Sequence, residues 1–71
     1  MKGKLHITGN LGEIEMMRSR EIVNKLIIES ETINEDGSLV WIVNYSSNLR
    51  EILKQLSWET PALQYDLKMV P

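Results

Sequence analysis

The chain has 71 residues, of which 42% are apolar and 25% charged, and its formal net charge is −2. This balance is too apolar and too weakly charged for an intrinsically disordered chain. Its eight basic residues are spread along the sequence, so no basic footprint for a nucleic-acid backbone is indicated.

The absence of cysteine excludes disulfides, thiolate metal sites and thiol nucleophiles. No apolar run is long enough to span a bilayer, and the opening residues do not resemble a signal peptide. We therefore expect one domain over residues 1–71, either a cytoplasmic protein or a cytoplasmic module of a longer chain, with no membrane insertion of this segment.

The first predicted element is a strand at residues 4–8, where polar and apolar residues alternate ahead of Gly9. A helix is predicted from about residue 11 to residue 22. Its start is indicated by Asn10, which is followed three residues later by Glu13, as a capping box requires.

The residues that follow change their apolar repeat. Leu11, Ile14 and Met17 form a stripe on one side of the predicted helix. A helix continued through Ile28 would be apolar all round, and so short a chain cannot bury such a helix. The sequence therefore predicts a change to an extended strand at about residues 25–33.

A hairpin is predicted next. Residues 34–37 have strong turn chemistry and end in Asp-Gly, a favoured hairpin dipeptide. The run at 39–43 is β-branched and aromatic and is apolar on both faces, which is typical of a central strand. The strand that ends near Ile33 should therefore pair antiparallel with a strand at 38–45.

The last two elements are a helix at 48–57 and a strand at 63–69. Asn48 can cap the helix, with Glu51 completing a capping box, although Ser46 and Ser47 are competing caps. Pro61 prevents continuation. Residues 63–69 alternate with period two, which is typical of a half-buried strand. The apolar stripe of the helix consists of Leu49, Ile52, Leu53 and Leu56.

The order strand, helix, strand, strand, helix, strand predicts an α+β domain of the ferredoxin-like type, βαββαβ. Right-handed crossovers place both helices on one face of a four-stranded antiparallel sheet. The first and third strands should lie in the middle, and the other face of the sheet should be open.

The third strand makes this open face unusual. If Leu5 and Ile7 face the helices, the first and last strands offer it polar residues: His6, Thr8, Gln64, Asp66 and Lys68. The third strand offers either Val40 and Ile42 or the set of Leu39, Trp41, Val43 and Tyr45.

Exposed apolar area usually marks an interaction site. We expect a homodimer, formed face to face or edge to edge through the second strand, with Val40, Trp41 and Ile42 at the interface. In the alternative interpretation, neighbouring side chains shield these residues.

Candidate chemistry is sparse. His6 is the single histidine, and a lone histidine does not make a tetrahedral metal site. No arrangement of nucleophile and base is indicated, so we expect no enzyme, no metal and no cofactor. Gly9, Asn10 and Gly12 open a helix and could present backbone N–H groups to an anion or carboxylate; the alternative is a tight strand-to-helix turn.

Several short features are spread over most of the chain: Asn10-Leu11-Gly12, Gly37, the strand Trp41-Ile42-Val43, and the helix 49–56 followed by Pro61 and Leu63. In these features the chain resembles the ACT domains, small regulatory modules with this topology. The resemblance implies a non-enzymatic regulatory or association module. It also implies a small-molecule effector, such as an amino acid, bound at a dimer interface near Gly9, Asn10 and Gly12.

The segment from Leu5 to Leu11 also resembles the first-strand signature of the RNA-recognition motif. That resemblance implies an adaptor that uses the open sheet face for RNA; a protein partner is the other adaptor hypothesis. RNA-recognition motifs stack bases on exposed aromatic residues of the two central strands. Here His6 stands in the aromatic position and the net charge is negative, so nucleic acid is the disfavoured partner.

Overall fold

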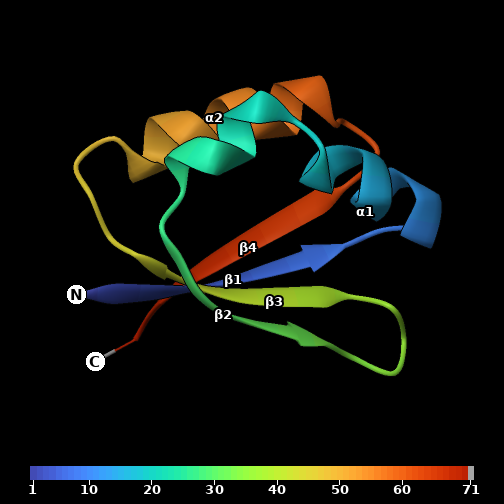
Figure 1. Cartoon of the computed structure of the whole chain (residues 1–71), viewed down its shortest axis with the longest axis horizontal. Helices are drawn as coiled ribbons and strands as arrows, with labels where there is room; N and C mark the ends of the chain where they lie inside the picture. Colours follow the sequence, from blue (N-terminus) through green and yellow to red (C-terminus); the bar gives the residue numbers. More distant parts are fainter. Residues whose placement is uncertain (71) are drawn as a thin grey trace.

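The strands form one antiparallel sheet in the order β2-β3-β1-β4, with the helices together on one side (Figure 1). The computed structural model describes residues 1–70. Its elements are β1 (Lys2–Thr8), α1 (Leu11–Arg18), the 3₁₀ helix η1 (Glu21–Lys25), β2 (Ile28–Ile33), β3 (Leu39–Asn44), α2 (Leu49–Glu59) and β4 (Gln64–Val70). The predicted α+β, ferredoxin-like βαββαβ arrangement is confirmed, with β1 and β3 in the middle of the sheet.

The core lies between the helices and the face of β1 that carries Leu5 and Ile7. Both residues are fully buried, and Leu5 lies opposite Trp41 on β3 and Leu67 on β4. Because opposite residues of an antiparallel pair point to the same side, this register fixes the helix-facing side of three strands. One cluster of buried residues results: Leu5, Ile7, Ile14, Met17, Ile22, Val23, Leu26, Leu39, Trp41, Val43, Leu49, Ile52, Leu56 and Leu63.

The register also decides which residues of β3 face solvent. Trp41 is 2% exposed and lies among the helix-facing residues, together with Leu39 and Val43. Val40 and Ile42 point to the open face and are partly exposed. Trp41 is therefore a core residue, and the expected interface on β3 is reduced to Val40 and Ile42.

The expected helix at 11–22 is shorter in the structure. The chain leaves α1 at Arg18, where the Ser19 hydroxyl donates to the Met16 carbonyl, and a separate 3₁₀ turn follows. That turn lets Ile22 and Val23 reach the core from a new direction. The change from helical to extended backbone before Ile28 is confirmed, although β2 begins about three residues later than predicted.

Two details of the helix predictions are wrong. Leu11 does not belong to the buried stripe, since it is 63% exposed, whereas Met17 is buried as expected. Asn48 makes no side-chain cap on α2, because its Oδ1 accepts a hydrogen bond from the Ser46 hydroxyl at 2.6 Å instead. Helix α2 also runs on to Glu59, two residues further than predicted.

The β2–β3 turn has the predicted hairpin chemistry. The Gly37 amide donates to the Asn34 carbonyl at 3.0 Å, and the Asn34 amide donates to the Ser38 carbonyl at 2.9 Å. Gly37 has φ of 88°, a left-handed conformation that glycine adopts without steric cost. None of the helices within residues 1–70 has the length and apolar content that a membrane span requires.

Candidate functional site

The predicted ligand residues Gly9, Asn10 and Gly12 come together at the β1–α1 turn, but two of them have structural roles there. The Asn10 Oδ1 accepts a hydrogen bond from the Glu13 amide at 2.8 Å and so caps α1. A side chain at position 9 would overlap the Cδ2 atom of Leu63, which is a core residue. Gly12 has no comparable structural role, since a Cβ at this position would meet nothing closer than the Asn10 Oδ1 at 3.6 Å.

A polar network joins the single histidine to the β2–β3 turn. The Ser38 hydroxyl is 3% exposed and donates to the Asp36 Oδ1 at 2.6 Å. It accepts from the Asn34 amide group at 2.8 Å and lies 3.1 Å from His6 Nε2. Because the hydroxyl has one proton and gives it to Asp36, His6 must be the donor from Nε2.

This network contains Ser, His and Asp but does not have the geometry of a nucleophile. In a catalytic triad the serine gives its proton to the histidine, and the aspartate orients that histidine. Here Ser38 gives its proton to Asp36, and His6 donates to the hydroxyl instead of accepting from it. The hydroxyl is also shielded from solvent. The network fixes the turn and orients the His6 ring.

The hydrogen bonds from Ser38 also act on the acidity of Asp36. Its carboxylate accepts from both the Ser38 hydroxyl and the Ser38 amide. These bonds, the hydroxyl first, lower the pKa of Asp36 because they stabilise its charged form. The Asp36 side chain is therefore an ionised acceptor that holds Ser38 in the β2–β3 turn.

The open sheet face is mainly polar. Lys2, Lys4, His6 and Thr8 of β1 lie on it, as do the β4 residues paired with them. His6 lies opposite Asp66, and Lys4 lies opposite Lys68. Val40 and Ile42 are the apolar residues that β3 contributes, and both are only partly exposed.

The edge strand β2 has a different character. All six of its residues are exposed, and the isoleucines at its ends, Ile28 and Ile33, are 37% and 63% exposed. Ile27 precedes the strand and is 61% exposed. In Figure 1, β2 is the strand farthest from the helices, although Arg18 at the end of α1 reaches its Glu31.

The charges of β2 are held by neighbouring elements. Glu31 accepts from Arg18 Nη1 at 3.0 Å and from the indole Nε1 of Trp41 at 2.6 Å. Glu29 pairs with Lys2 at 3.1 Å. A register shift between Ile28 and Ser30 adds a bulge at Glu29. The Trp41 indole thus finds its acceptor at the edge of the sheet.

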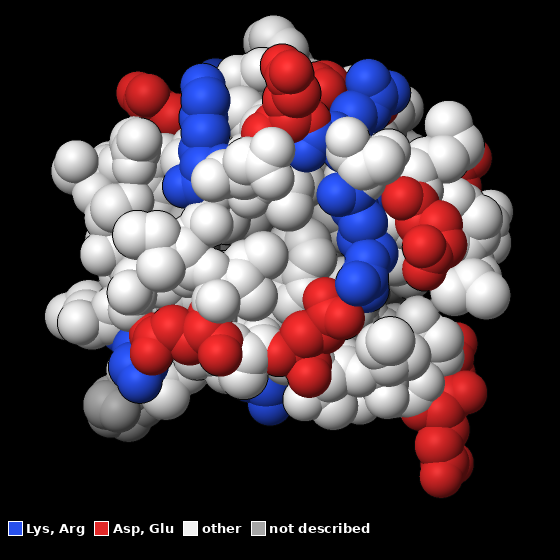
Figure 2. Space-filling model, viewed as in Figure 1, with Lys and Arg blue, Asp and Glu red and all other residues white. Residues whose placement is uncertain are grey.

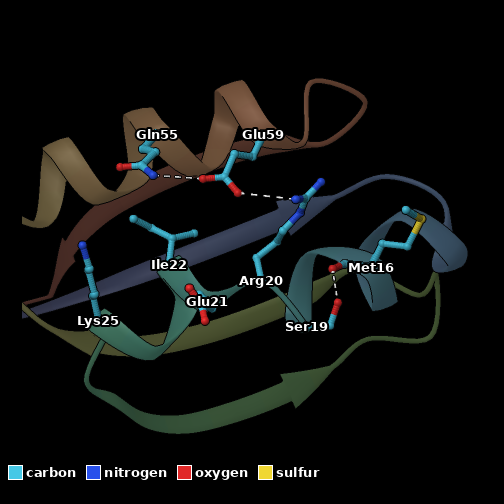
Figure 3. Close-up of a pocket in the computed structure, with 8 residues that line it drawn as sticks. All are labelled: Met16, Ser19, Arg20, Glu21, Ile22, Lys25, Gln55 and Glu59. Atoms are coloured by element: carbon cyan, nitrogen blue, oxygen red, sulfur yellow. Dashed lines mark hydrogen bonds and ion pairs between the residues drawn. The ribbon is translucent and has the colours of Figure 1, made fainter.

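A cleft of about 640 Å³ separates α1 and η1 from α2 (Figure 3). Two of its charged groups form an ion pair: Arg20 Nη1 lies 3.6 Å from a Glu59 carboxylate oxygen, and Gln55 donates to the other Glu59 oxygen at 3.0 Å. Among the described residues no buried side-chain polar atom lacks a hydrogen bond. The ion pair between Arg20 and Glu59 bridges the two sides of the cleft.

The two tryptophans have opposite environments. Trp58 lies in the last turn of α2, is 75% exposed, and has Lys54 Nζ at 5.7 Å from its ring centroid. At this exposure Trp58 does not cover the edge of the core. Among residues 1–70 no three side chains of His, Cys, Asp or Glu converge as metal ligands.

Comparison of the chain with protein-family models, with curated proteins and with solved structures gave no match. The candidate sites therefore rest on the residues described above. The best supported is the β2 edge, where exposed apolar residues and unpaired backbone lie together.

Proposed function

We propose that this chain is a non-enzymatic association module that dimerises by pairing its β2 edge with β2 of a second copy. The observation that carries the proposal is the exposure of every β2 residue, with isoleucines at both ends of the strand. An edge strand presents a row of unpaired N–H and C=O groups, which is a template for another strand. Joining two such edges forms one eight-stranded sheet.

The other edge of the sheet is a poorer candidate. Helix α2 contacts β4, and alternate residues of that strand are partly buried. Its outer positions include the charged Asp66 and Lys68, and Met69 is its one large apolar residue with substantial exposure, at 44%. The β2 edge therefore offers more apolar surface to a partner.

The charges on β2 favour one pairing register. In an antiparallel pair, residues that lie opposite each other point to the same face of the sheet. When a two-fold axis relates the two strands, this holds over residues 30–33 only if the axis passes through one residue, which then lies opposite its own copy. An axis at Glu31 would place two glutamates directly opposite each other, which is unfavourable. An axis at Thr32 places two threonines opposite each other and Ile33 opposite Glu31 of the second copy. The Thr32-centred register avoids the repulsion.

The acidic side chains of β2 and of the β2–β3 turn limit how tightly two such edges associate. Acidic side chains gather along the lower border of Figure 2, below the helices, where β2 and the β2–β3 turn lie in Figure 1. The ion pairs of Glu29 with Lys2 and of Glu31 with Arg18 offset part of this charge. Residual repulsion between exposed charges is screened by salt. The dimer should accordingly be stronger at higher ionic strength.

The regulatory part of the proposal assigns the β1–α1 turn to a small effector such as an amino acid. This turn lies at the same end of the sheet as the C-terminal end of β2, since Ile7 pairs with Leu39 and Leu39 pairs with Ile33. Gly12 supports the assignment because neither packing nor capping explains a glycine there. Titration of an amino-acid panel should move the amide resonances of Gly9, Asn10 and Gly12. A panel that leaves all three unmoved would remove this part.

The dimer is tested by mass in solution. The unmodified chain should show a concentration-dependent mass approaching twice 8.2 kDa in analytical ultracentrifugation. Ile33→Lys should shift it to the monomer, because it places a lysine in the apolar edge. Met69→Lys is the matched control on the β4 edge and should leave the mass unchanged. A monomer mass for the unmodified chain at every concentration would refute the dimer.

The second candidate function is a protein-binding adaptor that uses the open sheet face. Val40 and Ile42 favour it, since they form an apolar strip in the middle of an uncovered sheet. RNA is less well supported, because Trp41 and Tyr65 belong to the helix-facing side and Trp58 lies on α2. The open face thus lacks tyrosine and tryptophan rings on which bases could stack, and its one imidazole, His6, is hydrogen-bonded to Ser38.

A further inference from the structure

The open sheet face carries two lysines whose positive charges repel each other. Lys4 on β1 and Lys68 on β4 lie directly opposite each other in the register of the sheet. Like charges in this position destabilise a pair of strands. Within residues 1–70 Lys4 makes no ion pair, and the contact of Lys68 is a 4.0 Å approach to Asp66, with both side chains well exposed.

These residues surround a small hollow. Lys4, His6, Asp66 and Lys68 line a depression of about 90 Å³ between β1 and β4. Two lysines against one aspartate give it a positive balance, although the chain as a whole carries −2. The His6 ring on its border is held by Ser38. An anion in the hollow would lie between the two ammonium groups and relieve their repulsion.

We propose that this hollow binds the oxyanion head of a small phosphate compound. Val40 and Ile42 give the site its second feature, because Ile42 lies opposite Lys4 and Val40 lies opposite His6 on the same face. An apolar substituent on the phosphate would cover this strip. The site is independent of the β2 edge and makes no use of the dimer.

Two probes distinguish free phosphate from a phosphate ester. Inorganic phosphate and n-butyl phosphate are titrated at constant ionic strength while the amide resonances of Lys4, His6 and Lys68 are followed. Binding of the ester should be several-fold tighter, because its butyl chain would cover the apolar side chains of Val40 and Ile42. Equal affinities would assign the site to free phosphate and overturn the apolar part of the proposal.

Three charge variants test the site itself. Lys4→Gln and Lys68→Gln should each weaken binding about two- to fivefold, the upper part of the range for one exposed charge contact. Asp66→Asn should tighten binding, because it removes the competing carboxylate. Lys25→Gln on η1 makes the same charge change away from the hollow and should have no effect. Equal weakening by Lys25→Gln, or the absence of saturable shifts with either probe, would overturn the proposal.

Discussion

His6 Nε2 lies 3.1 Å from the hydroxyl oxygen of Ser38, a residue 32 positions away in the chain. The contact joins the central strand β1 to the start of β3 beside the hairpin turn. Because Ser38 gives its one proton to Asp36, the contact requires His6 to carry a proton on Nε2. The single histidine of the chain therefore acts as a donor in a structural network.

Ser38→Ala should destabilise the fold by about 1–3 kcal/mol. The substitution removes the hydroxyl that accepts from His6 and Asn34, and each hydrogen bond of this kind contributes about 0.5–1.5 kcal/mol. Urea denaturation measures the change. Ser47→Ala, at an exposed position, is the control and should be within about 0.5 kcal/mol of the unmodified chain. Equal midpoints for the two variants would show that the network contributes nothing.

The pKa of Asp36 should rise toward its ordinary value of 3.8 in Ser38→Ala. In the folded chain this pKa is lowered, first by the Ser38 hydroxyl bond and then by the Ser38 amide bond. The folded state therefore binds the proton more weakly than the unfolded state. The stabilisation by Asp36 is complete above pH 3.8 and is lost as pH falls through the folded-state pKa. Carbon-detected titration of the carboxyl group measures this pKa, and the same value in both chains would contradict the assignment.

The two glycines of the β1–α1 turn should respond oppositely to alanine. Gly9→Ala should cost about 1–3 kcal/mol, because its methyl group overlaps the Leu63 side chain in a packed core. Gly12→Ala has open space and a helical position, so a gain of up to about 1 kcal/mol is expected. Thermal or urea denaturation measures both. A loss of stability in Gly12→Ala would mean that its backbone conformation, not a ligand, requires glycine.

Local patterns were sufficient to predict most of the architecture. Alternation predicted β1 and β4, and the stripe of Leu49, Ile52 and Leu56 predicted α2; the three residues are buried in the structure. The expected end of the helical segment before Ile28 is also confirmed, since β2 begins there. Each of these patterns is contained in one short segment, so no long-range information is needed to interpret it.

The side of β3 that faces the helices could not be predicted from its own residues, because both sides are apolar. It is settled by the register that places Trp41 opposite Leu5, and by Glu31, which accepts the indole proton. A buried tryptophan usually requires an acceptor, so the nearby glutamate was a signal that sequence reasoning missed. The burial of Ser38 depends in the same way on His6, which only the folded sheet brings close.

The pairing of β2 with a second β2 can be measured most directly by single-cysteine cross-linking, because the chain has no cysteine and every disulfide must join two copies. Opposite residues of an antiparallel pair are close enough for a disulfide. Under mild oxidation Thr32→Cys should form a reducible dimer readily, Glu31→Cys more slowly, and Met69→Cys on the opposite edge least of all. Cross-linking of Thr32→Cys no faster than that of Met69→Cys would contradict the pairing of β2 edges.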